Sequence, residues 1–481
     1  SRGLGDVYKR QGQASSVCLG QTKLRRARLW QGMPIPPTED PPLEAFGPIV
    51  PLEDLPYDDV KDGDRPLWRR AAPPLNDFAT QASPLLFGGG VFGHGMYNQD
   101  SVLYSNEAVR ALRLAFKYGI NALDSSPYYF PSEFVLGRAL RILAPERPRS
   151  SYFLITKCGR YGPEKHMFDY TPERVHASIR KSLERLGTTY LDVALLHDVE
   201  FVSDQPAEAV KDSNAGWLEA CAVGTAQERV WSPEEAQKVL GIASEDASQI
   251  RGPGDERVLN AARALFELKD QGLVRQVGIS GYPLGELVRI VRLVASHPPY
   301  RCLDVVLSYS HHTLHSDLLP AWKDLFAACP PGREATWRAP VVLNASPFSM
   351  GLFSDRDPPA WHPADTRLMS AARGALRELQ KDAASPSSVV DPSVVMGRTA
   401  LFRGISGSEA MDPNGVPVLR TLIGMSNVDE VHAAMRIYRV LSQPALFERE
   451  YSQLAKYNEL VRTRILEAQV ADKAWPSPSE T

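Results

Sequence analysis

Four polar residues with complementary acid–base properties end or follow three consecutive apolar segments of the sequence. Asp124 ends the apolar part of INALDSS, and Tyr129 follows it in a stretch that Pro127 interrupts. Lys157 ends the next segment, YFLITK, and His197 ends the one after it, LDVALLH. If these segments are neighbouring parallel strands, a carboxylate, a phenol, an ammonium and an imidazole meet at one edge. We therefore expect these four residues to form a catalytic site.

This set of side chains suits proton transfer coupled to hydride transfer between a carbinol carbon and a nicotinamide. A free tyrosine, with a pKa of about 10, is a poor base near neutrality. We expect Lys157 to favour the phenolate of Tyr129 and lower its pKa, and Asp124 to keep Lys157 charged and oriented. His197 would donate a hydrogen bond to the reacting oxygen. Taken singly, each residue has an ordinary interpretation as a helix cap or a solvated rim residue, so the prediction depends on all four together.

Eight apolar segments rich in β-branched residues recur from Pro84 onwards and alternate with helical patterns. The candidate strands are PLLFG, INALDSS, YFLITK, LDVALLH, VRQVGISG, CLDVVLSYS, PVVLNASP and RTLIGMSN. Strands that are apolar almost throughout are typical of a parallel sheet covered on both faces, and their alternation with helices predicts βαβ units. The expected fold is a single (β/α)8 TIM barrel of the α/β class, with the four residues at the carboxyl ends of its strands.

Both ends of the chain and one internal segment depart from this repeat. Residues 1–75, whose opening SRGLGDVYKRQ resembles translated adapter sequence, lack sustained periodicity and are expected to be a flexible N-terminal extension. The barrel is expected over residues 76–450, with an insertion at residues 204–255 above its C-terminal face. A short helix is expected within residues 385–415, and a C-terminal helix and tail over residues 451–481.

Composition indicates an ordinary globular protein: 481 residues, 43% hydrophobic and 23% charged. The formal net charge of −3 predicts no nucleic-acid or membrane partner. No apolar run approaches the roughly 20 residues that span a bilayer. The five cysteines are scattered without a CxxC pair, which favours reduced thiols in a cytoplasmic protein. The oligomeric state stays open.

The motifs around these residues resemble a known family. The segment YGINALDSSPYYFPSEFVLGRAL, with FLITK and LDVALLHD at their following spacings, resembles the aldo-keto reductase superfamily. VGISGYP, VVLNASPFSMGLF, AWHPA and TLIGMSNVDEV are similar to its aldose 1-dehydrogenase branch. The resemblance runs from about Pro84 to Leu441. It implies oxidation of a sugar such as D-arabinose at C1, with the family's catalytic Asp, Tyr, Lys and His on the four residues named above.

The resemblance also implies where the nicotinamide binds. Ser280 matches a serine beside the carboxamide, and Gly281 stands where many relatives have Asn. Ser308 takes the place of a frequent Gln. Ala345 stands where many reductases have a tyrosine that stacks on the nicotinamide, and Phe130 replaces a usual Gly at the substrate mouth. Several of these positions depart from the common pattern of the reductases.

The phosphate end of the cofactor is expected on the last two strands. Ser346 and Phe348 match the segment that follows the pyrophosphate, and the helix that starts after Asn427 offers free N–H groups. NADP-using relatives have a Lys and an Arg where this sequence has Gly424 and Glu430, which favours NAD over NADP because a carboxylate repels the 2′-phosphate. The expected cofactor contacts are Gly89, Ser280, Gly281, Ser308, Ser346, Phe348, Gly424, Ser426, Asn427 and Glu430.

Four other features of the sequence have competing interpretations. GGGVFG, at residues 88–93, matches a Rossmann fingerprint in letters, but no helix opens inside its glycines. His311, His312 and His315 lack a further metal ligand at a matched spacing, so no metal site is expected. Cys158 is expected to be a packing residue, and Tyr128 is the alternative phenol to the neighbouring Tyr129.

Two other functions stay open at this point. The same four residues would serve an NADPH-dependent aldehyde or ketone reductase. Some relatives with this fold are mainly cofactor-binding regulatory subunits, and the insertion and the N-terminal extension would then be partner surfaces. The small-molecule partner expected in the main interpretation is a sugar.

Overall fold

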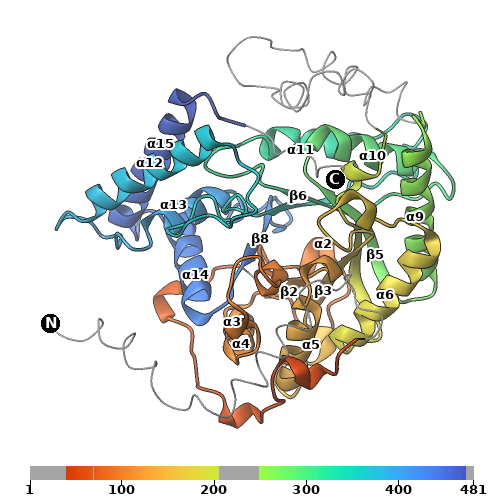
Figure 1. Ribbon diagram of the computed structural model, residues 1–481, viewed down its shortest axis with the longest axis horizontal. Coiled ribbons are helices and arrows are strands. Elements are labelled where there is room, and N and C mark those ends of the chain that lie inside the picture. Colours follow the sequence, from red (N-terminus) through yellow and green to blue (C-terminus); the bar gives the residue numbers. More distant parts are fainter. Residues whose placement is uncertain (1–39, 69, 205–248, 473–481) are drawn as a thin grey trace. The chain divides into compact units, whose positions relative to one another are not determined.

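Eight parallel strands form a closed barrel in the computed structural model, which describes residues 40–68, 70–204 and 249–472. Each strand pairs with the next one in the sequence, and the last pairs with the first (Figure 1). The strands are β1 (Leu85–Gly88), β2 (Ala122–Asp124), β3 (Phe153–Cys158), β4 (Leu191–Leu196), β5 (Val274–Gly281), β6 (Val305–Tyr309), β7 (Val341–Ala345) and β8 (Arg420–Gly424). All eight predicted strands and the predicted (β/α)8 fold are confirmed, and the closed barrel excludes the Rossmann alternative.

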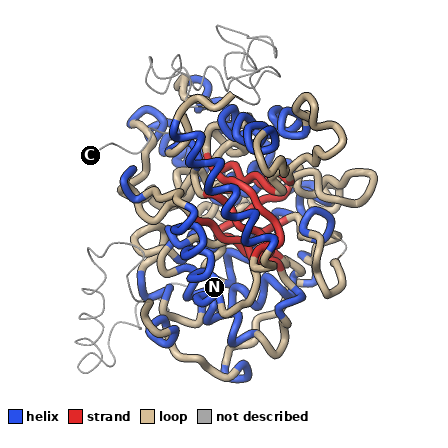
Figure 2. The backbone as a smooth tube through the Cα atoms, turned by 90° about the vertical axis from the view of Figure 1, so that its right-hand side faces the viewer, coloured by secondary structure: helices blue, strands red, loops and turns tan. Residues whose placement is uncertain are grey.

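Helices surround the barrel, so that the red strands in Figure 2 lie inside a layer of blue helices. They begin and end where the sequence indicates: α6 starts with Pro172 in its first turn, and Gly187 ends it with a left-handed φ of 66°. The longer helices are α4 (Glu107–Tyr118), α5 (Ser132–Leu143), α6 (Pro172–Leu186), α9 (Pro253–Asp270), α10 (Leu284–Ser296), α11 (Leu319–Ala327), α12 (Thr366–Ala383), α13 (Val395–Gly404), α14 (Val428–Ser442) and α15 (Glu448–Glu467).

Short elements occupy the connections. They are α2 (Phe78–Gln81), α3 (Asp100–Leu103) and the 3-10 turns η1 (Leu43–Phe46), η2 (Leu52–Asp54), η3 (Asp62–Asp64), η4 (Gly89–Phe92), η5 (Pro127–Tyr129), η6 (Arg149–Ser151), η7 (Lys165–Met167) and η8 (Val199–Phe201). The apolar ring of Phe78 in α2 packs edge-on against Phe153 at 5.3 Å. This contact adds α2 to the cluster of side chains that fills the barrel interior.

The expected flexible extension through residue 75 is wrong for residues 42–75, which belong to the same compact unit as the barrel. Phe46 is buried and stacks on Phe134 of α5, and Trp68 packs edge-on against Tyr438 of α14 at 4.7 Å. The aromatic residues of this stretch are too far apart in sequence to show a periodic pattern, so their burial could not be read from spacing. Residues 1–39 lie outside the described residues.

Most of the predicted insertion, residues 205–248, also lies outside the described residues. The short helix expected within residues 385–415 is confirmed as α13. The C-terminal helix is confirmed as α15, which starts at Glu448 and buries Leu454, Val461 and Ile465 beside α12 and α13 (Figure 1). The final residues of the predicted tail, 473–481, are not described.

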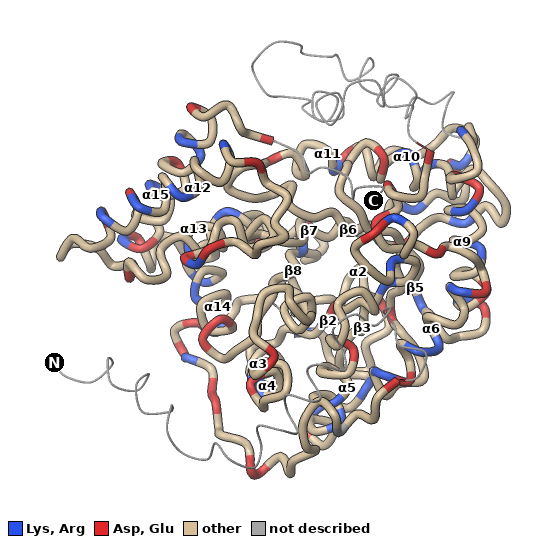
Figure 3. Tube along the Cα trace, in the orientation of Figure 1, with Lys and Arg blue, Asp and Glu red and all other residues tan. Residues whose placement is uncertain are grey.

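Lys and Arg positions (blue) and Asp and Glu positions (red) are interspersed along the outer helices (Figure 3), in keeping with the small net charge of −3. Across the residues that the structure describes, no helix is both long and apolar enough to cross a membrane.

Candidate active site

Each strand places one inward-facing residue at the mouth of the barrel. Side chains alternate between the two faces of a strand, and buried residues such as Ile155 on β3 and Leu195 on β4 identify the inward face because they fill the barrel interior. The residues that continue this face at the carboxyl ends are, from β1 to β8, Gly88, Asp124, Lys157, His197, Ser280, Tyr309, Ala345 and Gly424. The predicted acid, ammonium and imidazole therefore lie on three neighbouring strands.

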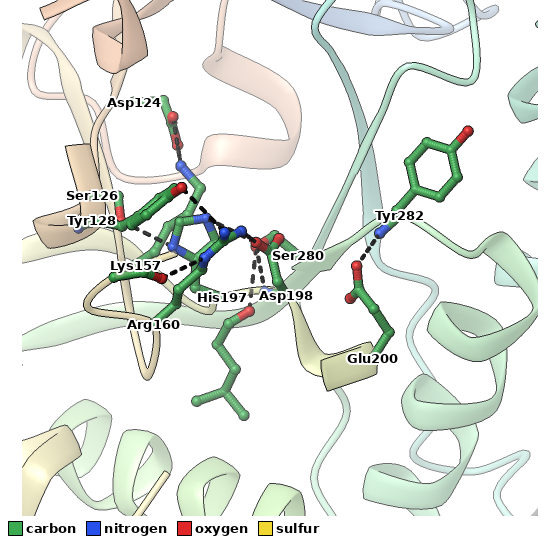
Figure 4. A network of polar contacts seen from close by, with 12 residues as sticks. Asp124, Ser126, Tyr128, Lys157, Arg160, His197, Asp198, Glu200, Ser280 and Tyr282 are labelled. Atoms are coloured by element: carbon green, nitrogen blue, oxygen red, sulfur yellow. Dashed lines mark hydrogen bonds and ion pairs between the residues drawn. The ribbon is translucent and has the colours of Figure 1, made fainter. Parts of the chain in front are cut away.

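Lys157 and Asp124 form a buried ion pair at the base of the mouth (Figure 4). Lys157 Nζ donates to the two carboxylate oxygens of Asp124 at 2.7 and 2.6 Å and to the carbonyl oxygen of Ser125 at 3.0 Å. These three bonds use all three N–H donors of the ammonium. Burial raises the pKa of Asp124, and the charge and hydrogen bonds of Lys157 oppose that rise. The pairing predicted for these residues is present.

Tyr129 lies between this ion pair and His197. Its ring centroid is 4.8 Å from Lys157 Nζ and 5.6 Å from the His197 ring, which it meets almost perpendicularly. Burial raises the pKa of Tyr129 well above its ordinary value, and the Asp124 carboxylate adds to the rise. The expected lowering by Lys157 is therefore wrong for the protein alone, because burial has the larger effect and the Asp124 carboxylate adds to it.

His197 is held as a neutral imidazole. Its Nδ1 lies 3.0 Å from Ser126 Oγ, which also accepts a hydrogen bond from the backbone N–H of Tyr128 at 3.1 Å. A hydroxyl that accepts from Tyr128 N can direct its own proton to Nδ1, which favours the tautomer with hydrogen on Nε2. Burial lowers the pKa of His197 well below its ordinary value, and the charges of Lys157 and Arg160 add to this. The imidazole can thus donate from Nε2 to a substrate oxygen.

A second buried ion pair adjoins His197, and the sequence prediction missed it. Arg160 Nη1 donates to Asp198 Oδ2 at 2.5 Å, and that oxygen lies 3.7 Å from His197 Nε2. Arg160 Nη2 also donates to the Tyr128 hydroxyl at 3.1 Å (Figure 4). Tyr128 is thereby engaged by Arg160, whereas Tyr129 faces Lys157, which supports Tyr129 as the reacting phenol. Two features of the sequence could have indicated this ion pair: Asp198 directly follows His197, and Arg160 lies three residues after Lys157.

The structure explains why position 281 has no side chain. Ser280 faces inward and is buried. A Cβ on Gly281 would lie 2.3 Å from Glu200 Oε2, because the buried Glu200 carboxyl fills that space and accepts from Tyr282 N at 2.9 Å. The Asn that relatives are expected to have here would collide with Glu200. Glu200 itself was not predicted.

The two inward positions on β6 and β7 are an aromatic residue and a small one. Tyr309 is paired in register with Ala345, so both face the mouth. Tyr309 remains partly exposed, and its ring lies 5.2 Å from that of Tyr282. Ser308, in contrast, shares the face of Val306, which packs in the outer core, so the structure does not bring Ser308 to the mouth. The sequence prediction named Ser308 as the cofactor contact on this strand and missed Tyr309, the neighbouring residue that faces the mouth.

The loop after β7 engages its own polar groups. Ser346 has a left-handed φ of 58°, and its Oγ accepts a hydrogen bond from Met350 N at 2.8 Å. Phe348 is partly exposed in the same turn. Gly89, at the other end of the predicted set, approaches β2 closely: a Cβ there would lie 2.6 Å from the Asp124 carbonyl oxygen. Glycine at position 89 therefore allows the chain to pack closely against β2, the strand that carries Asp124.

The start of α14 is closed by its own side chains. Asn427 Oδ1 accepts from Glu430 N at 3.0 Å, and Glu430 Oε2 accepts from Ser426 N at 2.6 Å and Ser426 Oγ at 2.9 Å. This is a reciprocal arrangement that stabilises a helix start. A Cβ on Gly424 would lie 2.4 Å from Val91 Cγ1, so no larger side chain fits at this end of β8.

The chemistry of these residues fits a flat dinucleotide along the β5–β8 half of the mouth. Gly424 and Ala345 keep that half free of long side chains, Tyr309 offers an aromatic face, and the 15-residue helix α14 points its N-terminus from the end of β8. A helix N-terminus attracts anionic groups such as phosphates, although Asn427 already accepts from Glu430 N and the Glu430 carboxylate lies at this end. The chemistry of this half is compatible with a nicotinamide dinucleotide, and the remaining contacts named from the sequence stay predictions.

The other motifs are packing residues. His311 Nε2 lies 2.7 Å from the Tyr282 carbonyl oxygen, His312 pairs with Asp317, and His315 Nδ1 lies 2.9 Å from Thr313 Oγ1. Among the described residues no group of ligands could hold a metal ion. Cys158 is fully buried, and burial raises the pKa of its thiol.

Curated relatives of this chain include two sugar dehydrogenases. L-galactose dehydrogenase of Arabidopsis thaliana is 29% identical over 402 residues, which cover 82% of this chain and 92% of that protein. D-arabinose 1-dehydrogenase of Saccharomyces cerevisiae is 29% identical over 333 residues, which cover 68% and 81%. The solved structure of a glycerol dehydrogenase from Gluconobacter oxydans is 18% identical, with a TM-score of 0.43, over 82% of this chain and 97% of that chain.

The match to a whole family covers the complete barrel. Residues 84–443 match the aldo/keto reductase family, and this range includes all eight strands and the four residues around Tyr129. The chain therefore belongs to the aldo/keto reductase family.

Proposed function

We propose that this protein oxidises an aldose of the D-arabinose kind at C1 to the aldonolactone, with NAD as the hydride acceptor. The observation that carries the proposal is the position of Tyr129 between the Lys157–Asp124 ion pair and the neutral His197. The names of the two curated relatives, L-galactose dehydrogenase and D-arabinose 1-dehydrogenase, support an aldose as the substrate.

In the proposed reaction the residues around Tyr129 move one proton and orient one oxygen. When bound, the oxidised nicotinamide supplies the hydride acceptor and a positive charge near Tyr129. For this Tyr129 must first give up its own proton, and as the phenolate it then accepts the proton of the C1 hydroxyl as the hydride leaves. His197 donates from Nε2 to the same oxygen and fixes its direction. Lys157, held by Asp124, keeps a positive charge 4.8 Å from the phenol ring.

Two features of the last strand support NAD rather than NADP. The space beside Gly424 is filled by Val91, which leaves no room for a Lys at that position without displacing Val91. Glu430 adds a carboxylate at the start of α14 and occupies the Ser426 N–H and hydroxyl that an anion would otherwise use. A 2′-phosphate near this carboxylate would be repelled.

A second function is favoured by one specific observation. Burial keeps the pKa of Tyr129 well above its ordinary value, which makes the phenol a proton donor. A donor is what reduction of an aldehyde or ketone by NADPH requires. The same four residues would then act in the opposite direction.

A turnover screen at 340 nm separates these functions. We expect the wild-type protein to reduce NAD with D-arabinose, L-galactose, L-fucose or D-xylose, more slowly with NADP, and to oxidise NADPH poorly with simple carbonyl compounds. Faster carbonyl reduction with NADPH would favour the second function. Cofactor binding without any turnover would instead indicate a regulatory subunit.

Replacement of the phenol tests the mechanism. Tyr129→Phe should lower kcat about 100- to 10,000-fold because it removes the proton-transfer group, with NAD affinity unchanged. Tyr128→Phe is the matched control, since it removes a neighbouring hydroxyl that contacts Arg160. An active Tyr129→Phe enzyme would contradict the assignment.

A further inference from the structure

Asp198 is a buried carboxylate placed beside the imidazole that orients the reacting oxygen. It follows β4 directly, its side chain is 4% exposed, and its backbone is left-handed with φ 57°. Few residues other than glycine adopt this conformation readily, although Asp tolerates it. Its Oδ2 takes the Arg160 hydrogen bond and lies 3.7 Å from His197 Nε2. The carboxylate is therefore fixed next to the place where substrate must bind.

Its second oxygen is free to bind a ligand. Within the described part of the chain, Asp198 Oδ1 accepts no hydrogen bond, and it is not among the buried polar atoms sealed from solvent. A carboxylate oxygen that lacks a protein partner gains most from a ligand that donates a hydrogen bond. Sugar hydroxyl groups are such donors.

Arg160 cannot easily leave this carboxylate. Its guanidinium lies 4.0 Å from the Tyr128 ring centroid and 5.3 Å from that of Phe168, and its Nε donates to the Gly162 carbonyl oxygen at 3.2 Å. Loops that follow β2, β3 and β4 meet around it (Figure 4). These contacts hold Arg160 in place, and Arg160 in turn fixes the orientation of Asp198.

Two carboxyl groups, those of Asp198 and Glu200, lie near the guanidinium of Arg160. Glu200 is also buried, and burial together with the Asp198 charge raises the pKa of Glu200 well above its ordinary value. Burial raises the pKa of Asp198 as well, but the charge and hydrogen bond of Arg160 oppose this rise. Because the Arg160 guanidinium donates its hydrogen bond to Asp198, it favours the charged form of Asp198 more than that of Glu200.

We propose that Asp198 accepts a hydrogen bond from the substrate hydroxyl on the carbon next to the reacting carbon, and so selects polyhydroxylated substrates. This proposal rests on the proposed oxidation at C1, because the reacting oxygen is placed at His197 Nε2 and the C2 hydroxyl is its nearest neighbour on the sugar. Arg160 is the positioning residue for this carboxylate.

The test compares two sugars that differ at one hydroxyl. D-arabinose and 2-deoxy-D-ribose share the same configuration except that the second lacks the C2 hydroxyl. The wild-type enzyme should have a kcat/KM about 10- to 100-fold higher for D-arabinose, the factor expected for a hydrogen bond to a charged group. Asp198→Asn should reduce this preference to a few-fold, mostly by slower turnover of D-arabinose.

Controls separate recognition from structure. Asp270→Asn, at an ion pair with Arg301 in which Asp270 is 68% exposed, should keep the preference of the wild type. If Asp198→Asn slows both sugars equally, Asp198 acts only by positioning His197 and the proposal is overturned. The same conclusion follows if the wild-type enzyme does not distinguish the sugars, a result that stands even if Asp198→Asn fails to fold.

Binding measurements distinguish this proposal from the proposed function. Tryptophan fluorescence of the NADH-loaded protein reports sugar binding without turnover. If the wild type binds D-arabinose more tightly than 2-deoxy-D-ribose in an Asp198-dependent way but oxidises neither, the recognition site stands and the proposed oxidation falls. If the wild type oxidises aldoses but Asp198→Asn retains the preference, the recognition site falls and the oxidation stands.

Discussion

The two halves of the barrel mouth are built from different kinds of residues. On β2–β4 the inward residues and their neighbours are charged or titratable, and the ion pairs Lys157–Asp124 and Arg160–Asp198 are buried apart from Arg160, which is 14% exposed. On β5–β8 the inward residues are Ser280, Tyr309, Ala345 and Gly424, which carry no charge near neutrality. The β2–β4 half carries the charged groups where proton transfer is proposed. The β5–β8 half consists of uncharged residues that leave space for a flat ligand.

This difference predicts opposite sensitivities to substitution. A buried charge that loses its partner remains as an uncompensated charge, so the β2–β4 half should be most sensitive to changes of charge. A close-packed surface of small residues has no room for added atoms, so the β5–β8 half should be most sensitive to added volume.

The largest effect is expected from breaking the Lys157–Asp124 pair. Lys157→Met should lower the free energy of unfolding by about 3–5 kcal/mol, because Asp124 is left buried without its partner. Lys456→Met is the matched control. The ion pair between Lys456 and Asp382 is about as short, at 2.8 Å, but the Lys456 side chain is 59% exposed and that of Asp382 is 41% exposed. That control should cost under about 1 kcal/mol in chemical denaturation. Equal losses in the two variants would remove the distinction between the halves.

The sequence showed the β2–β4 half well because its residue types are informative by themselves. Asp124, Lys157 and His197 each end an apolar strand, so chemistry and placement could be read together. Arg160 and Asp198 were missed because their pairing depends on how two loops fold back toward each other, which residue spacing does not encode. The confirmed fold followed from eight apolar strands and the helix ends between them.

The β5–β8 half was harder to predict because its residues act through the space that they leave. Gly281 is explained only by the position of Glu200, and Gly424 only by that of Val91. Ser308 was predicted from its place in a motif, but strand alternation turns it outward and brings Tyr309 to the mouth. Neighbours of this kind are known only from the three-dimensional structure.

Added volume at Gly281 should destabilise the β5–β8 half. Gly281→Ala places a methyl group 2.3 Å from Glu200 Oε2 and 3.0 Å from Leu287 Cδ2, so we expect a loss of about 1–3 kcal/mol in the free energy of unfolding. Gly374→Ala, in α12 with no atom within 4 Å of the new Cβ, should stabilise by up to about 1 kcal/mol. A neutral Gly281→Ala would show that Glu200 moves freely.

His311, beside Tyr282, tests whether the β5–β8 half tolerates a charge. Burial lowers the pKa of His311 to about 4, below its ordinary value of 6.5. Between these values the unfolded chain binds the proton and the folded chain does not, so His311 contributes stability above pH 6.5 that is lost as the pH falls toward 4. In this pH range the free energy of unfolding should fall by up to about 1.4 kcal/mol per pH unit.

Replacement of His311 isolates this contribution from the other titrating groups. Chemical denaturation of the wild type and His311→Gln at several pH values between 7.5 and 5 gives the difference in stability, which should narrow as the pH falls. His166→Gln, at a side chain that is 70% exposed, should leave the pH dependence unchanged. A constant difference for His311→Gln would mean that His311 can be protonated in the folded protein.

The smallest effect concerns the aromatic face of Tyr309. Its ring faces the mouth beside Ala345, and the proposed NAD would stack its nicotinamide there. Tyr309→Ala should weaken NAD binding about two- to tenfold, the range that corresponds to an aromatic contact of about 0.5–1.5 kcal/mol. Tyr309→Phe keeps the ring and should bind as the wild type does, as measured by titration calorimetry. If both variants bind equally, the contact comes from another residue, and the β5–β8 half holds the cofactor by its backbone and helix α14 alone.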